Sequence, residues 1–160
     1  MNNNNPFFYS YLASPIGLVE ICANQDAIVS IYFVESQKQP ANGNGICELA
    51  KRQLSDYFDG KLQSFDLPLD AQGTKFQQDV WRALAQIPYG ETCSYADIAQ
   101  RLHNPKAVRA VGAANGKNPI SIVVPCHRVI GASGKLTGYA GGLERKSWLL
   151  TLEQKQGTLV

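Results

Sequence analysis

The chain has 160 residues, of which 44% are hydrophobic and 18% charged, an ordinary globular mixture that excludes disorder beyond the ends. No stretch approaches the roughly 20 apolar residues of a membrane span, and the Asn-rich start lacks the basic and apolar regions of a secretion signal. We therefore expect a soluble, cytoplasmic protein that makes no membrane contact.

The formal net charge of +2 is unevenly divided. Residues 1–70 carry 4 Lys/Arg and 8 Asp/Glu, whereas residues 71–160 carry 11 and 5. A basic second half favours a polyanionic partner, although a solvated basic face with no partner explains the charge equally well.

Four cysteines are present, and no two of them form a CxxC pair. With only two histidines in the chain, we do not expect a zinc site or another metal site. An intracellular setting argues against disulfides. Cys22 and Cys47 fall in apolar segments, where a thiol acts as a small hydrophobe, and Cys93 has no assigned role.

The first half predicts a three-stranded β-meander followed by a helix. Turn-forming residues separate three short β-rich runs, which are Phe7–Ala13, Gly17–Ala23 and Ala27–Val34. Apolar residues at near-helical spacing predict a helix over Ile46–Asp59, and Gly60 suits its C-terminal stop. An extended linker then runs over Lys61–Gly73, and we place a domain boundary near residue 70.

The second half is predicted to be mostly helical. Thr74 with Gln77, and Ser94 with Asp97, form capping-box patterns before two helices, the second spanning Tyr95–Leu102. Asn104 and Pro105 suggest an N-cap and first residue for a third helix that runs to about Asn115. Two short helices joined by a tight turn form a helix-turn-helix pattern. The expected fold class is α+β, with residues 1–70 as a small structural domain and residues 71–160 as the helical domain.

The third helix has an unusual composition. Its apolar stripe, expected to pack inward, comprises Ala107, Ala110, Val111 and Ala114. Its opposite side holds Arg109, Gly112, Ala113 and Gly116. This side presents one long cation over a nearly bare backbone, which suits close approach to a flat or narrow surface. Close helix packing beside a solvated arginine is the alternative.

The segment Ile120–Ile130 contains the chemically informative residues. An apolar run predicted as a buried strand leads through Pro125 to Cys126 and His127. A free thiol is only a few per cent ionised at neutral pH, so a nucleophilic cysteine needs a base or a cation. Neighbours on a regular strand point to opposite faces, so cooperation would require a bend after Pro125 or a bridging water. The dipeptide alone favours a buried cysteine beside a surface histidine.

Residues 118–129, Asn118-Pro-Ile-Ser-Ile-Val-Val-Pro-Cys-His-Arg-Val129, closely resemble the active-site segment of the O6-alkylguanine-DNA alkyltransferases, or methylated-DNA–protein-cysteine methyltransferases. Four more segments match in order and spacing: Ser94-Tyr95, Asn104-Pro-Lys-Ala-Val-Arg-Ala-Val-Gly112, Thr137-Gly-Tyr-Ala-Gly-Gly142 and Lys146-Ser-Trp-Leu-Leu150. The likeness covers residues 74–155. The first 70 residues match only in general style, as a sheet and helix of the ribonuclease-H-like kind. With Ala140 and no zinc ligands, the sequence resembles the bacterial constitutive type, which lacks the extra cysteine-rich domain of the adaptive-response regulators.

The resemblance implies a catalytic role for four residues. Cys126 corresponds to the alkyl acceptor, and His127 to the base that deprotonates it through a water. Glu153 corresponds to the carboxylate that orients the histidine. This assignment rests on the alignment register alone, and the alternative is that Glu153 is a solvated acid near a helix end. Tyr95 corresponds to the tyrosine whose hydroxyl assists the guanine leaving group, although an aromatic core residue would otherwise be expected.

The resemblance also implies contacts to DNA and to the damaged base. Arg109 corresponds to the finger that fills the gap left by an extruded nucleotide, and Asn118 to a hinge between the active-site segment and the DNA-binding motif. Tyr139 and Ala140 correspond to the loop that walls the guanine pocket, where Ala140 offers only its backbone N–H. The further expected contact residues are Ser94, Gly112, Ala113 and Val129.

The implied function is DNA repair by a methylated-DNA–[protein]-cysteine S-methyltransferase. Each molecule would act once, on O6-alkylguanine and also on O4-alkylthymine. No cofactor is expected for this reaction, since the lesion itself is the alkyl donor. The protein would bind the DNA minor groove as a monomer, with cooperative binding left open, and would flip the damaged base out of the stack. One alternative is a non-catalytic lesion-binding relative, which the presence of Cys126 argues against. The other alternative is an unrelated thiol hydrolase that uses Cys126 and His127. Such an enzyme would not account for Arg109 or for the helix-turn-helix.

Overall fold

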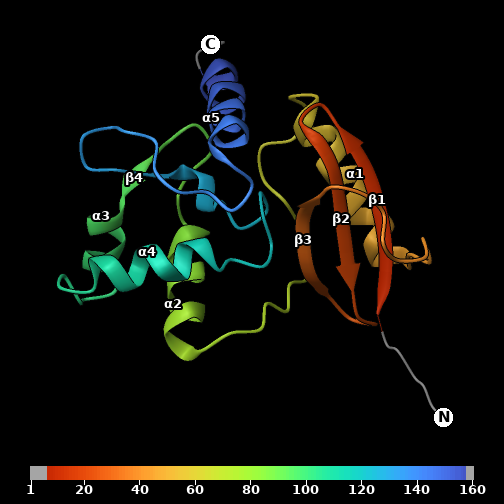
Figure 1. Ribbon diagram of the computed structural model, residues 1–160, viewed down its shortest axis with the longest axis horizontal. Coiled ribbons are helices and arrows are strands. Elements are labelled where there is room, and N and C mark those ends of the chain that lie inside the picture. Colours follow the sequence, from red (N-terminus) through yellow and green to blue (C-terminus); the bar gives the residue numbers. More distant parts are fainter. Residues whose placement is uncertain (1–6, 158–160) are drawn as a thin grey trace. The chain divides into compact units, whose positions relative to one another are not determined.

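The structure, a computed structural model, describes residues 7–157. The chain divides between Ala71 and Gln72 into two compact units (Figure 1). Across residues 7–157, none of the helices combines the length and the apolar character needed to cross a membrane.

The first unit is an antiparallel three-stranded sheet packed against one helix. Strands β1 (Phe8–Ser14), β2 (Gly17–Ala23) and β3 (Ile28–Val34) lie in chain order, and helix α1 spans Gly45–Phe58. The predicted meander and helix are therefore confirmed, with bounds shifted by one residue. The Asn44 side chain accepts the Cys47 N–H at the start of α1, and the residue after its C-cap is Gly60 with φ +76°.

Alternation along β2 places the core of this unit. Val19, Ile21 and Ala23 are fully buried, and α1 contributes the buried Leu54 and Tyr57. Cys22 and Cys47 are also buried, and burial raises the pKa of both thiols, which fits their predicted packing role. The linker after α1 is not wholly unpaired, because Leu69 forms a parallel bridge to Ile28.

The second unit is mostly helical (Figure 1). Its elements are α2 (Lys75–Leu84), β4 (Cys93–Ser94), α3 (Tyr95–Arg101), α4 (Val108–Gly116), the 3-10 turn η1 (Cys126–Arg128), β5 (Val129–Ile130) and α5 (Leu143–Gly157). Both predicted capping boxes, at Thr74 and Ser94, are present with their reciprocal hydrogen bonds. Helix α4 packs against α2 and α3, and the Trp81 indole N–H donates to the Ala114 carbonyl at 2.9 Å.

A short parallel ladder of β4 and β5 has no counterpart among the predicted elements. Cys93 pairs with Val129 and Ser94 with Ile130. Because Tyr95 opens α3 directly after β4, this ladder joins the start of the helix-turn-helix to the segment that follows Cys126.

Two predictions for α4 are wrong. The helix begins at Val108, and its N-cap, Ala107, makes no side-chain capping bond. Asn104 instead closes a turn by accepting the Ala107 N–H at 3.0 Å. Ala110 is exposed, and the buried stripe runs through Val111, Ala114 and Asn115. The buried polar residue of this stripe, Asn115, donates from its amide to the Cys126 carbonyl at 3.5 Å.

The predicted strand over Ile120–Val124 is also wrong, although most of the segment is buried. The Val123 and Val124 amides donate to the Ser121 and Ile120 carbonyls, and Ile122 has φ +74°. The chain therefore turns back on itself, leaving only an isolated bridge between Ser121 and Val124. The Asn118 side chain donates to the Ile120 and Val124 carbonyls and accepts the Ile120 N–H, and these bonds hold the turn and outweigh its β propensity.

Candidate active site

Cys126 lies at the start of a tight turn and is 3% exposed. Pro125 has φ −83° and ψ 63°, and Cys126–Arg128 then form a single 3-10 turn in place of a strand. Strand alternation therefore no longer separates the Cys126 and His127 side chains. The bend that their cooperation requires is present in the structure.

His127, Arg128 and Glu153 form a buried charged network. The Nε2 of His127 lies 2.7 Å from Oε2 of Glu153, and neither side chain is accessible to solvent. Arg128 donates from Nε to Oε1 at 2.8 Å and from its second terminal nitrogen to Oε2 at 3.0 Å. A third guanidinium nitrogen donates to the Ile87 carbonyl at 2.7 Å, and the guanidinium carbon lies over the Tyr89 ring, 5.6 Å from its centroid. Glu153 is thus not the solvated acid that the sequence left open.

The network determines which nitrogen of His127 carries a proton. Burial alone would raise the pKa of Glu153, but the hydrogen bonds from His127 and Arg128, together with the nearby positive charge, lower it to about 2. The ionised carboxylate can only accept hydrogen bonds, so Nε2 of His127 donates to it. Burial lowers the pKa of His127 and favours the neutral ring. Nδ1 then has a free lone pair, and it has no hydrogen-bond partner among residues 7–157.

The environment of Cys126 favours the thiol at rest. Burial raises its pKa, while the Asn118 side chain and the positive charge of Lys146 act in the opposite direction. Asn118 is buried and donates from its amide to the Val124 carbonyl at 2.8 Å, which places it inside the turn before Cys126. Ionising this sulfur therefore requires a base at the moment of reaction.

Lys146 is a fully buried cation that the sequence reasoning missed. Its ammonium donates to the Val129 carbonyl at 2.6 Å and to the Thr137 carbonyl at 2.7 Å, and burial lowers its pKa. In the sequence it stands beside Glu144 and Arg145 and looks like part of a solvated face. The usable signal was helical spacing, since Lys146, Leu149 and Glu153 share one side of α5 and are all buried.

Two of the predicted pocket residues lie in the loop between β5 and α5, residues 131–142. Tyr139 has a buried hydroxyl, and burial together with the neighbouring Cys126 raises its pKa. Ala140 is exposed. Tyr95 is half-buried, and its hydroxyl lies 2.7 Å from Oγ1 of Thr137 in the same loop.

The remaining predicted residues divide between this cluster and the surface of α4. Val129 is buried in β5, and the Ser94 hydroxyl caps α3 by accepting the Asp97 N–H. Gly112 faces Tyr95, since a Cβ built on it would lie 3.9 Å from the ring. Arg109 and Ala113 are exposed on α4, so the structure does not bring them to the cysteine.

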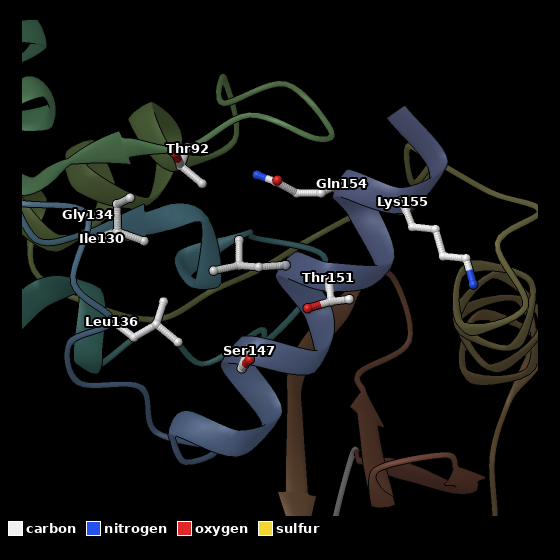
Figure 2. A pocket seen from close by; sticks show the side chains of 9 residues that line it. Thr92, Ile130, Gly134, Leu136, Ser147, Thr151, Gln154 and Lys155 are labelled. Carbon is white, nitrogen blue, oxygen red and sulfur yellow. The ribbon is translucent and has the colours of Figure 1, made fainter. Parts of the chain in front are cut away.

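A separate open pocket of about 570 Å³ lies between β5, the following loop and one side of α5 (Figure 2). Its apolar lining residues include Ile130, Leu136 and Leu150, and Gln154 and Lys155 line it from α5. None of the residues that line it belongs to the Cys126 network, defined as Cys126 together with His127, Arg128, Lys146 and Glu153. It is therefore not the site of the chemistry described above.

Together, the fold and the site define a class of protein in which a buried thiol beside a histidine–carboxylate pair is joined to a helix-turn-helix. Comparison with known proteins identifies the family. The family model of the 6-O-methylguanine DNA methyltransferase DNA-binding domain matches residues 75–155, and that of the ribonuclease-like domain of the same enzymes matches residues 7–71. The chain belongs to the 6-O-methylguanine DNA methyltransferase family, and the resemblance seen in the sequence is confirmed.

Curated relatives named methylated-DNA–protein-cysteine methyltransferase match over nearly their whole length. The Methanosarcina acetivorans protein is 49% identical, covering 91% of this chain and 97% of its own, and the Mycolicibacterium paratuberculosis protein is 51% identical, covering 92% of each. The crystal structure of Mycobacterium tuberculosis O6-methylguanine methyltransferase superposes with a TM-score of 0.86 at 47% identity, covering 96% of both chains. Mycobacterium tuberculosis OGT in complex with DNA gives 0.85 at 48% identity, covering 93% of this chain and 94% of its own.

Proposed function

We propose that this protein repairs DNA by transferring the alkyl group of O6-alkylguanine, and also of O4-alkylthymine, irreversibly to its own Cys126. The observation that carries the proposal is a buried cysteine followed directly by a histidine bound to an ionised carboxylate, in a chain whose relatives are named for alkyl transfer to cysteine. The residues for such a transfer lie in the second unit. We assign residues 71–160 the DNA-binding and chemical roles, and residues 1–70 a structural one.

The proposed reaction begins with proton transfer from Cys126. The proton passes through a water to Nδ1 of His127, and Glu153 stabilises the resulting imidazolium through Nε2. The thiolate attacks the alkyl carbon in line, a C–S bond forms, and the C–O6 bond breaks with its electron pair moving to the guanine. Tyr95 donates a hydrogen bond to the purine as this charge develops. The guanine anion then takes up a proton from water, and the His127 imidazolium returns the cysteine proton to water, so charge and protons balance. The product is a thioether that none of these residues can hydrolyse, so each molecule acts once.

Reaction in duplex DNA requires the damaged nucleotide to leave the base stack, because a stacked base does not permit in-line attack. We assign Arg109 to the vacancy left behind, since it is exposed on a helix face whose neighbours, Ala113 and Gly116, have almost no side chain. That face suits the narrow minor groove. The structural neighbour that was solved with DNA supports DNA as the partner. We further propose a monomer that acts in the cytoplasm, where thiols such as Cys126 stay reduced.

Intact-mass spectrometry after mixing the protein with an oligonucleotide that contains O6-methylguanine tests the proposal. We expect a mass increase of one CH2, mapped to the peptide that contains Cys126, with one lesion removed per molecule. Cys126→Ser should still bind lesion DNA but gain no mass, whereas Cys93→Ser, a matched control at a half-buried cysteine outside the network, should react normally. Binding without modification would instead favour the lesion-binding alternative, and many turnovers per molecule would favour a hydrolase.

A further inference from the structure

The side chain and the backbone of Thr137 are bound from two different directions. Its Oγ1 lies 2.7 Å from the Tyr95 hydroxyl, and its carbonyl accepts a 2.7 Å hydrogen bond from the Lys146 ammonium. Thr137 lies in the loop between β5 and α5, whereas Tyr95 opens α3, forty-two residues earlier. A loop residue is thus held directly against the tyrosine that we assign to the leaving group.

Lys146 fixes Thr137 relative to the cysteine segment. The same ammonium that binds the Thr137 carbonyl donates to the Val129 carbonyl at 2.6 Å, and Val129 follows the turn that begins at Cys126. Lys146 is fully buried, and its bond to Val129 is closed to solvent while that to Thr137 is partly shielded. The Lys146 ammonium therefore holds both the backbone of Thr137 and the chain segment next to Cys126.

Only one proton can lie between the two hydroxyl oxygens, and its source determines what Tyr95 can do. If Tyr95 donates to Thr137, the tyrosine proton is engaged and cannot reach the purine. If Thr137 donates, the tyrosine oxygen is an acceptor, its own O–H is free, and accepting a hydrogen bond makes that O–H a stronger donor.

We propose that Thr137 is a positioning residue for alkyl transfer, whose hydroxyl donates to Tyr95 when the damaged base is bound and directs the Tyr95 O–H at the guanine leaving group. This inference rests on the proposed function and on the role of Tyr95 within it. No bond to Thr137 forms or breaks in the reaction. Its hydroxyl keeps its proton throughout, and the effect reaches the purine only through Tyr95.

Two substitutions separate the hydroxyl from packing. Thr137→Val keeps the branched shape and the methyl group, which lies 3.4 Å from the point that a Cβ on Gly131 would occupy. Thr137→Ser keeps the hydroxyl and loses the methyl. Thr151→Val, the same chemical change at an exposed threonine of α5, is the matched control.

The test measures rates of Cys126 alkylation by free O6-benzylguanine and by its 8-aza analogue, whose extra ring nitrogen makes the purine a better leaving group. We expect Thr137→Val to slow the reaction with O6-benzylguanine about tenfold, the size of one neutral hydrogen bond. The loss should be clearly smaller for the aza compound, which depends less on Tyr95. Thr137→Ser should restore most of the rate, and Thr151→Val should match the wild type.

A double-mutant cycle with Tyr95→Phe completes the test. Because Thr137 acts through the tyrosine hydroxyl, Thr137→Val should cause no further loss in the Tyr95→Phe protein. An equal loss on both substrates, or the same loss in both backgrounds, would show a purely structural tether and overturn the inference. A wild-type protein that gains no mass from the O6-methylguanine oligonucleotide would overturn the proposed function itself, so the two failures are distinguishable.

Discussion

The buried ion pair of Glu153 and Arg128 should make the second unit acid-sensitive by a calculable amount. The perturbation is the double substitution Glu153→Gln with Arg128→Met, which removes both charges together and leaves no uncompensated buried ion. His127 stays in place in this variant. The pair is suited to the purpose because the side chain of Glu153 is only 1% exposed and solvent does not screen it.

The magnitude follows from the pKa of Glu153, which lies at about 2 against an ordinary value of 4.5. A pKa lowered on folding stabilises the protein when the carboxyl is ionised, here by about 3 kcal/mol. That stabilisation is fully present above the unfolded pKa and is lost as pH falls from about 4.5 toward 2. By pH 3 the wild type should have lost about 2 kcal/mol that the double variant never had.

His127 contributes in the same direction but over a different pH range. Burial lowers its pKa below the ordinary 6.5, so the folded state loses stability once the pH falls below that value and the unfolded histidine is protonated. The double variant keeps this histidine. Glu153 raises the pKa of this histidine and Arg128 lowers it, so removing both together makes opposing changes that offset each other. The difference between the two proteins below pH 5, where the unfolded histidine is protonated in both, therefore reports chiefly Glu153.

Urea unfolding followed by tryptophan fluorescence measures the effect. Both tryptophans of the chain, Trp81 and Trp148, belong to the second unit, so the signal reports the part that holds the ion pair. The difference in unfolding free energy between wild type and double variant should change by about 2 kcal/mol between pH 6 and pH 3. Parallel curves over this range would refute the reasoning, because the carboxyl would then have the same pKa in both states.

Two further variants test the DNA contact and the buried cation. Arg109→Ala should slow the repair of duplex DNA severalfold and leave reaction with free O6-benzylguanine nearly unchanged, because Arg109 is exposed on α4 and outside the Cys126 network; equal losses on both substrates would contradict the finger assignment. Lys146→Met should slow the reaction with O6-benzylguanine and shift its pH–rate profile to higher pH, because the charge of Lys146 lowers the pKa of the Cys126 thiol. A slower reaction with an unmoved profile would limit Lys146 to holding the loop.

Local signals in the sequence predicted the features that depend on neighbouring residues. The capping boxes at Thr74 and Ser94 give the helix starts correctly, because each uses a side chain three residues from its partner. The β-meander follows from turn residues between alternating apolar runs. The motif around Cys126 identified the family, because a long segment of matching residues is far more specific than a Cys-His pair.

Features that depend on distant partners were not predictable in the same way. The Ile120–Val124 run has strand composition, but Asn118 hydrogen-bonds it into a turn. Arg128 and Lys146 look like surface cations, and their burial depends on Glu153 and on carbonyl acceptors that only the fold brings close. Pairing of two-residue strands leaves no periodicity to detect.

The ladder of β4 and β5 has a consequence for the entropy of the reaction. The strand β4 leads directly into Tyr95, and β5 directly follows the turn that begins at Cys126, so two main-chain hydrogen-bonded strands fix the spacing of two groups far apart in the sequence. Such a site is preorganised, and little conformational freedom remains to be lost when a lesion enters. More of the binding energy of the duplex is then available for unstacking the damaged base.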